Sequence, residues 1–201
     1  MAQKAQLRAR LKDVVKHLDP LQRARKDMAI SERLKACLND RFSASQNRQL
    51  IIGVYAPLKD EVSWYQTSFE HFNLAFPARN GASSENMSFY PAKYHELTES
   101  SEFGALIRVP ASGREPVAPS IVVVPGLAFS TKGFRLGRGK GYYDKYLEHY
   151  KGPTIGVCYE EQIVDNIPTQ VHDCPVGLLI TEDRLIDCQM ERKAGPSGGS
   201  K

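Results

Sequence analysis

The chain has 201 residues, 41% of them hydrophobic, and a formal net charge of +4. This length and apolar content predict a single domain built around one substantial hydrophobic core. No apolar run is long enough to cross a membrane, and the first residues form no apolar signal sequence. The four cysteines have neither Cys-x-x-Cys nor zinc-site spacing, which favours reduced thiols. We therefore expect a cytoplasmic protein that does not bind membranes.

Two helices are predicted at the N-terminal end. The apolar side chains of the first helix recur at helical spacing, namely at Leu7, Leu11, Val14, Val15 and Leu18. Asp19-Pro20 is typical of an N-cap followed by proline at the first helical position, and it predicts a second helix to about Cys37.

This N-terminal segment is basic. Residues 1–48 contain twelve Lys and Arg against five Asp and Glu, and such a segment can contact nucleic acid or another polyanion. Lys4 and Arg8 lie four residues apart, so both project from one side of the first helix. Their spacing alone favours a solvated basic face, with an anion site as the alternative.

The middle of the chain alternates between apolar segments and loops. Leu50–Tyr55, Leu74–Pro77 and Met87–Tyr90 predict strands, and Trp64–Phe72 predicts a short helix. Glu61 follows the first of these strands, and ligands of α/β sheets are usually bound just past strand ends. A lone acid at this place also fits a surface charge or a helix cap.

A basic, glycine-rich loop follows the buried strand predicted at Ile121–Val124. Four glycines alternate with four cations between Lys132 and Gly141, and a helical pattern begins at Tyr142. A strand, a glycine loop and a helix in this order place free backbone N–H groups and the positive end of a helix dipole together. The loop therefore predicts a site for the phosphates of a nucleotide, and Asp144 fits a bridging Mg²⁺ ion. A solvated glycine-rich turn is the alternative.

The loop matches neither of two common nucleotide motifs. Five residues separate Gly133 from Gly139, whereas the Walker pattern needs four and a following Lys-Ser or Lys-Thr. The dinucleotide fingerprint needs a glycine where Tyr142 stands.

Two more buried strands are predicted at Thr154–Cys158 and Val176–Thr181. Strands separated by helices predict an α/β domain with a largely parallel central sheet. Residues 192–201 have the composition of a disordered tail, which leaves residues 1–191 as the single domain.

Pro125-Gly-Leu-Ala-Phe129 and Gly133-Phe-Arg-Leu-Gly-Arg-Gly-Lys-Gly-Tyr-Tyr-Asp144 resemble the signature of the 5-formyltetrahydrofolate cyclo-ligase family. Weaker matches extend from Lys4 to Thr181. The resemblance implies a three-layer Rossmann-like arrangement and the conversion of ATP and 5-formyltetrahydrofolate into 5,10-methenyltetrahydrofolate, ADP and phosphate. We expect a monomer that binds this small-molecule substrate and no nucleic acid.

The resemblance also implies roles for individual residues. The catalytic residues would be Arg138, Lys140 and Tyr142. ATP would be bound by Lys4, Arg8, Arg135, Leu136, Gly137, Arg138, Gly139, Lys140, Gly141, Tyr142 and Tyr143. The folate would be bound by Arg8, Ala56, Glu61 and Tyr142. Mg²⁺ would be held by Asp144 and Asp173.

Three places depart from the family's pattern. Ser63-Trp64 stands where the family often has Asp or Asn followed by Thr, Ser130 where it usually has Asp, and Arg108-Val109-Pro110 where an acid before proline is expected. Ser130 and the altered segment at residues 103–110 leave a non-catalytic folate-binding member as one alternative. A basic protein that binds RNA or nucleotides is the other.

Overall fold

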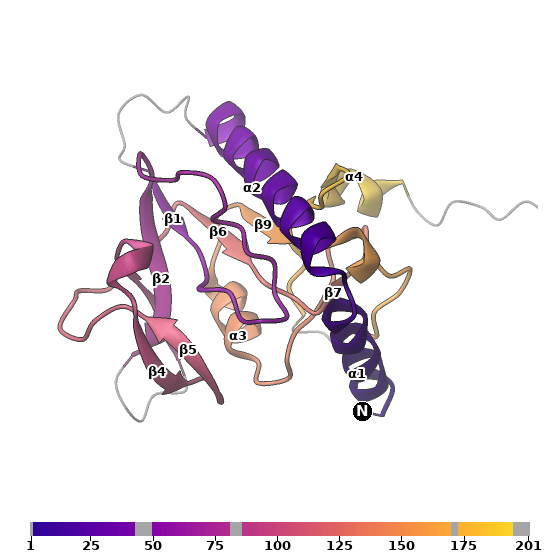
Figure 1. Ribbon diagram of the computed structural model, residues 1–201, viewed down its shortest axis with the longest axis horizontal. Coiled ribbons are helices and arrows are strands. Elements are labelled where there is room, and N and C mark those ends of the chain that lie inside the picture. The colour runs from indigo at the N-terminus through magenta and orange to yellow at the C-terminus, as the bar shows by residue number, and fades with distance from the viewer. Residues whose placement is uncertain (1, 43–49, 81–85, 170–172, 195–201) are drawn as a thin grey trace, which may run out of the picture.

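The protein is described by a computed structural model that covers residues 2–42, 50–80, 86–169 and 173–194 (Figure 1). Its centre is a seven-stranded sheet with the strand order β11-β10-β9-β6-β1-β2-β3. The strands are β1 (Ile51–Gly53), β2 (Asn73–Arg79), β3 (Met87–Pro91), β6 (Ile121–Val124), β9 (Thr154–Val157), β10 (Leu178–Ile180) and β11 (Leu185–Asp187). The five inner strands are parallel, and β3 and β11 pair antiparallel at the two edges. The prediction of a largely parallel α/β sheet is confirmed.

Helices cover both faces of this sheet and give three layers. The helices are α1 (Ala2–Lys16), α2 (Pro20–Phe42), α3 (Tyr142–His149) and α4 (Cys188–Lys193), with the short 3₁₀ turns η1 (Tyr94–Glu96) and η2 (Glu160–Gln162). Strand β6 shows why the layers form, because its four side chains are fully buried and alternate between the faces. Ile121 and Val123 belong to the core under α2, whereas Val122 and Val124 belong to the core that contains Leu147 of α3.

The N-terminal helices form as predicted, and α2 continues beyond Cys37 to Phe42. The carboxylate of Asp19 caps α2, since its Oδ1 accepts hydrogen bonds from the backbone N–H groups of Leu21 and Gln22, both at 3.0 Å. Helix α1 packs through Leu11 against a small two-stranded unit. The strands of that unit are β7 (Ala128–Phe129) and β8 (Arg135–Leu136).

The helix predicted at Trp64–Phe72 is wrong. This segment is a series of turns, because side chains of α2 bind its backbone. The hydroxyl of Ser31 donates to the carbonyl of Trp64 and accepts from the N–H of Gln66 at 3.0 Å. The helix-like spacing of the apolar residues arises because the Trp64 ring and its neighbours fill the core beside α2.

The structure also contains elements that the sequence analysis did not predict, among them a hairpin and a C-terminal helix. A hairpin of β4 (Thr98–Glu102) and β5 (Ala105–Val109) precedes the Pro-rich connector. Helix α4 includes Arg192, whose Nη1 donates to the carbonyl of Lys132 at 2.6 Å, so the ordered chain extends past the predicted start of the tail. The remainder of that predicted tail, from residue 195, lies outside the described residues. Within the described part of the chain, no helix is both long and apolar enough to cross a membrane.

Two features of the structure require glycine at position 133: its backbone conformation and the close approach of Val176. Its φ is +86°, and a Cβ there would lie 2.4 Å from the carbonyl oxygen of Val176. Gly113 has nearly the same φ, +84°, but a Cβ there would meet nothing within 4 Å. We expect Gly133→Ala to lower the free energy of unfolding by about 3 kcal/mol or more, because steric overlap adds to backbone strain. Gly113→Ala measures strain alone and should cost about 1 kcal/mol. Urea denaturation measures the free energy of unfolding of both variants. If both lose the same amount, the backbone near Val176 moves aside without cost.

Candidate active site

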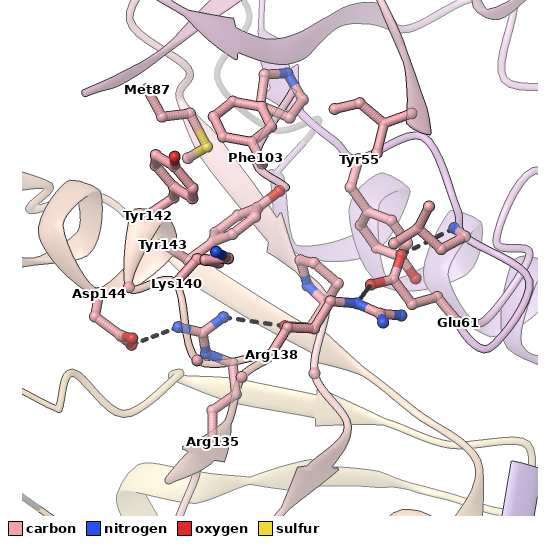
Figure 2. Close-up of a pocket in the computed structure, with 18 of the residues that line it drawn as sticks. Tyr55, Glu61, Met87, Phe103, Arg135, Arg138, Lys140, Tyr142, Tyr143 and Asp144 are labelled. Atoms are coloured by element: carbon pink, nitrogen blue, oxygen red, sulfur yellow. Dashed lines mark hydrogen bonds and ion pairs between the residues drawn. The ribbon is translucent and has the colours of Figure 1, made fainter. Parts of the chain in front are cut away.

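A cavity of about 130 Å³ opens beyond the ends of β1 and β6, against the start of α3 (Figure 2). Most of the residues that the sequence predicted for the site line it. These are Ala56, Glu61, Arg135, Gly137, Arg138, Gly139, Lys140, Gly141, Tyr142, Tyr143 and Asp144. The cavity lies where the carboxyl ends of neighbouring parallel strands meet, which is the usual place for a ligand in this architecture.

The glycine loop turns into α3 through left-handed residues. Gly139 has φ +100° and Gly141 has φ +74°, and Gly141 is the N-cap of the helix. The N–H of Lys145 donates to the carbonyl of Gly141 at 2.9 Å, so the helical bonds begin here. The N–H groups of the first turn have no partner within the helix, and together with its dipole they favour an anion.

Arg138 connects this loop to the segment after β1. Its Nε donates to Oε1 of Glu61 at 3.0 Å (Figure 2), and its Nη2 forms an ion pair with Asp60. Oε2 of Glu61 accepts the N–H of Leu58 at 3.0 Å. Burial raises the pKa of Glu61, although the Arg138 charge opposes the shift. Burial also acts to raise the pKa of Asp60, but the hydrogen bond and charge of Arg138 outweigh it and lower that pKa.

Arg135 and the start of α3 supply a second ion pair. The guanidinium of Arg135 forms an ion pair with Asp144, donates from Nη1 to the carbonyl of Pro125 at 3.2 Å and lies over the Tyr143 ring. Its Nε and the hydroxyl of Tyr143 are buried and have no hydrogen-bond partner within the described part of the protein. Both residues line the cavity, so a ligand there can satisfy polar groups that the protein leaves unpaired.

The predicted residues of α1 do not line the cavity: Arg8 contacts the glycine loop, and Lys4 contacts Asp173. Nε of Arg8 donates to the carbonyl of Gly137 at 2.9 Å, and Nζ of Lys4 lies 3.1 Å from Oδ2 of Asp173. Leu136 is also outside the cavity, because its side chain is buried with Leu11 beneath α1. For Leu136, therefore, only the backbone remains available to a ligand.

The two carboxylates predicted to bind the metal form ion pairs with different basic side chains in this structure. Asp144 lines the cavity beside Arg135, whereas Asp173 contacts Lys4 and does not line the cavity. Among the described residues no three acidic, histidine or cysteine side chains form a group that could hold a metal ion. The described side chains alone therefore do not form a complete metal-binding site. One or two carboxylates still suit Mg²⁺ when phosphate oxygens and water complete its octahedron.

Sequence reasoning missed the wall that the β4–β5 hairpin provides. The Phe103 ring meets Tyr142 edge-on at 4.5 Å between centroids, and Lys140 packs over Gly104. Phe103 and Gly104 both have positive φ, +53° and +76°, as a two-residue turn of this hairpin requires. The available signal was this Phe-Gly pair followed by the β-forming residues of β5. Met87 of β3 also lines the cavity, whereas Phe89 is fully buried in the core.

Glu61 allows a test of the site's electrostatics. Because burial raises its pKa in the folded protein, the ionised carboxylate lowers stability once the pH exceeds the ordinary value of 4.5. We expect Glu61→Gln to be at least as stable as the wild type at pH 7, with the difference shrinking as the pH falls toward 4.5. Asp60→Asn is the control of opposite sign, because a lowered pKa means that ionised Asp60 stabilises the fold. Urea denaturation at several pH values measures both. A less stable Glu61→Gln at pH 7 would show that the Arg138 contact outweighs burial.

Comparisons with known proteins identify the family of this chain. The model of the 5-formyltetrahydrofolate cyclo-ligase family matches residues 1–182. A mouse 5-formyltetrahydrofolate cyclo-ligase is 29% identical, and the match covers 88% of this chain and 92% of the mouse protein. The NMR structure of an Aquifex aeolicus 5,10-methenyltetrahydrofolate synthetase is 29% identical with a TM-score of 0.72, covering 98% of this chain and 95% of that one. A 5,10-methenyltetrahydrofolate synthetase from Mycoplasma pneumoniae, at 22% identity and a TM-score of 0.68, shares the fold over 89% of this chain and 98% of its own. With a match over residues 1–182, the chain belongs to the 5-formyltetrahydrofolate cyclo-ligase family, and it is a ligase.

Proposed function

We propose that this protein uses ATP and Mg²⁺ to cyclise 5-formyltetrahydrofolate to 5,10-methenyltetrahydrofolate, releasing ADP and phosphate. The observation that carries the proposal is the 3.0 Å contact between Arg138 of the glycine loop and Glu61 after β1. It brings a phosphate-binding loop and an acid suited to a pterin to one cavity. A reaction between a nucleotide and a folate needs these two sites side by side.

The phosphates of ATP fit the loop on chemical grounds. The start of α3 offers unpaired N–H groups, and Arg138 and Lys140 line the same cavity as cations. Arg8 supports the loop from α1 through the carbonyl of Gly137. Charge stabilisation and alignment are the main requirements of phosphoryl transfer, and these groups can supply both.

The pterin ring fits other residues of the same cavity. Adjacent N–H donors on its edge match a carboxylate with two acceptor oxygens, and Glu61 is the buried carboxylate of the cavity. Phe103, Met87 and Tyr142 supply the apolar and aromatic surface that a flat ring needs.

Mg²⁺ would be held by Asp144, with Asp173 as the second carboxylate, and it would neutralise phosphate charge. Both acids pair with cations in this structure, so metal and nucleotide together would replace Arg135 and Lys4 as partners.

The chemistry explains why ATP is needed. A formamide oxygen is a poor leaving group, so N10 cannot close the ring until that oxygen is activated. In the proposed reaction the formyl oxygen attacks the γ-phosphorus and ADP departs, which gives an imidate phosphate. N10 then adds to the formyl carbon, and the C–O bond breaks with loss of phosphate. Positive groups of the loop would stabilise the charge, and no covalent protein nucleophile is required.

The proposal extends to a monomeric, cytoplasmic enzyme that uses neither nucleic acid nor a membrane. All four cysteines are free thiols, and three of them are buried, which suits a reducing compartment.

Purified protein with Mg-ATP and 5-formyltetrahydrofolate tests the proposal through the absorbance of the methenyl product. We expect absorbance to rise only when both substrates are present. Folate binding without turnover would indicate the non-catalytic alternative, and salt-dependent RNA affinity without folate binding would indicate the nucleic-acid alternative.

Lys140→Ala should weaken ATP binding about ten- to a hundredfold, because a charged hydrogen-bond partner of the phosphates is lost. Folate affinity should stay within about twofold. Lys132→Ala is the matched control, since it removes the same charge from the same segment but does not line the cavity. Calorimetric titration with each ligand gives both affinities. If Lys140→Ala loses both ligands equally, the loop shapes the whole site and does not simply hold phosphate.

Asp144→Asn and Asp173→Asn should raise the Mg²⁺ concentration needed for half-maximal activity, because each removes a charged oxygen ligand. Asp165→Asn, an exposed acid outside the cavity, is the control. Magnesium titrations at saturating ATP measure the effect. A magnesium dependence that stays the same in both variants would refute the metal role.

A further inference from the structure

Helix α2 presents one polar row to the segment that carries Glu61. Arg23, Asp27 and Ser31 follow each other at intervals of four residues, so they lie along a single face. All three bind the backbone between Glu61 and Gln66. None of the three lines the cavity, and the reaction proposed above assigns them no role.

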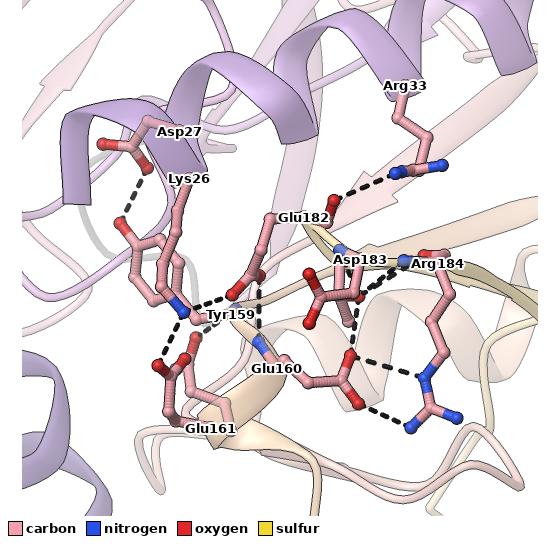
Figure 3. A network of polar contacts seen from close by, with 11 residues as sticks. Lys26, Asp27, Arg33, Tyr159, Glu160, Glu161, Glu182, Asp183 and Arg184 are labelled. Carbon is pink, nitrogen blue, oxygen red and sulfur yellow. Dashed lines mark hydrogen bonds and ion pairs between the residues drawn. The ribbon is translucent and has the colours of Figure 1, made fainter. Parts of the chain in front are cut away.

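Arg23 and Asp27 meet at the hydroxyl of Tyr159, which follows β9. The Tyr159 hydroxyl donates to Oδ1 of Asp27 at 2.7 Å and accepts from Nε of Arg23 at 3.0 Å (Figure 3 shows the Asp27 contact). Asp27 is 6% exposed and Tyr159 is fully buried. We name Arg23, Asp27 and Tyr159 the α2 anchor.

The α2 anchor holds the backbone on both sides of Val62. Nη2 of Arg23 donates to the carbonyl of Glu61 at 2.9 Å, and Oδ1 of Asp27 accepts the N–H of Ser63 at 3.0 Å. The carbonyl between them, that of Val62, accepts the hydroxyl of Tyr55 at 2.9 Å. Three consecutive residues are therefore held by side chains, two of which (Asp27 and Tyr55) are buried, and we infer that the direction of the Glu61 carboxylate is fixed with them.

A buried carboxylate is a costly way to hold two secondary-structure elements together. An isolated buried charge is unfavourable, and a hydrophobic contact of equal size stabilises at least as well. Other polar contacts already join α2 to the rest of the molecule (Figure 3). Lys26 forms ion pairs with Glu161 and Glu182, and Arg33 donates a hydrogen bond to the carbonyl of Glu182. Those contacts do not involve the backbone of residues 61–63.

We propose that Arg23, Asp27 and Tyr159 are positioning residues that place the Glu61 carboxylate against Arg138 and toward the folate. This inference rests on the proposed function for the identity of the ligand. The residues act through the backbone of Glu61 and Ser63 and touch neither substrate.

Tyr159→Phe is the sharpest test, because it keeps the buried ring and removes one hydroxyl. We expect the affinity for 5-formyltetrahydrofolate to fall about tenfold and that for ATP to change less than about twofold. Asp27→Ala should behave in the same way. Asp27→Asn should restore most of the affinity, since its oxygen can still accept from Ser63 and Tyr159.

Lys26→Met is the matched control, because Lys26 precedes Asp27 and stabilises the same interface without reaching the Glu61 segment. It should lower the melting temperature and leave both affinities unchanged. Amide hydrogen exchange gives a readout without ligand: Tyr159→Phe should speed exchange about tenfold across residues 58–66, and Lys26→Met should not.

The inference is overturned if Tyr159→Phe binds 5-formyltetrahydrofolate as tightly as Lys26→Met does, or if folate and ATP affinities fall together. A wild-type protein that neither binds nor cyclises 5-formyltetrahydrofolate would instead refute the proposed function. In that case the exchange measurement still decides the placement of Glu61, with faster exchange supporting the α2 anchor and unchanged exchange refuting it.

Discussion

The contact of Arg138 with Asp60 and Glu61 is the interaction on which the site depends, and it exists because of the sheet. Strands β1 and β6 are parallel neighbours, with Gly53 opposite Val122, so the chain leaves both at the same edge. The segment after β1 carries the two acids, and the loop some distance after β6 carries the arginine. A change in the pairing of these two strands would separate the groups and divide the cavity between them.

This ion pair also prepares the cavity for polar ligands. The carboxylate of Glu61 and the guanidinium of Arg138 are already removed from much of the surrounding water, and other protein atoms fix their orientation. A phosphate or a pterin edge therefore finds its partners ordered, and less side-chain entropy is lost on binding. The ligand must in turn replace an existing contact, which limits affinity for any anion that offers charge alone.

The sequence was informative where the physics is local. The β-formers of Ile121–Val124, the cap at Asp19 and the start of α3 after Gly141 depend on neighbouring residues, and all three are present. Glu61 was assigned to the site through the family resemblance, because its place after a strand also fitted a surface charge or a helix cap. Contacts between distant segments were not predictable, such as that of Arg8 with the Gly137 carbonyl across 129 residues. The helix wrongly predicted at Trp64–Phe72 has the same cause, because side chains of α2 take its backbone hydrogen bonds.

The buried acids of this protein separate stability from function. Burial raises the pKa values of both Glu61 and Asp27, so each ionised carboxylate costs folding free energy at neutral pH. Exposed pairs such as Arg184 with Glu160 avoid most of that cost, because water screens them. A fold that needed only stability would place apolar side chains at positions 27 and 61. The carboxylates instead lie one behind the other, Asp27 bound to the backbone of the segment and Glu61 directed into the cavity. In the proposed arrangement Asp27 on the helix orders the segment, and the segment orders Glu61. A ligand-binding acid needs such supporting contacts to hold its orientation.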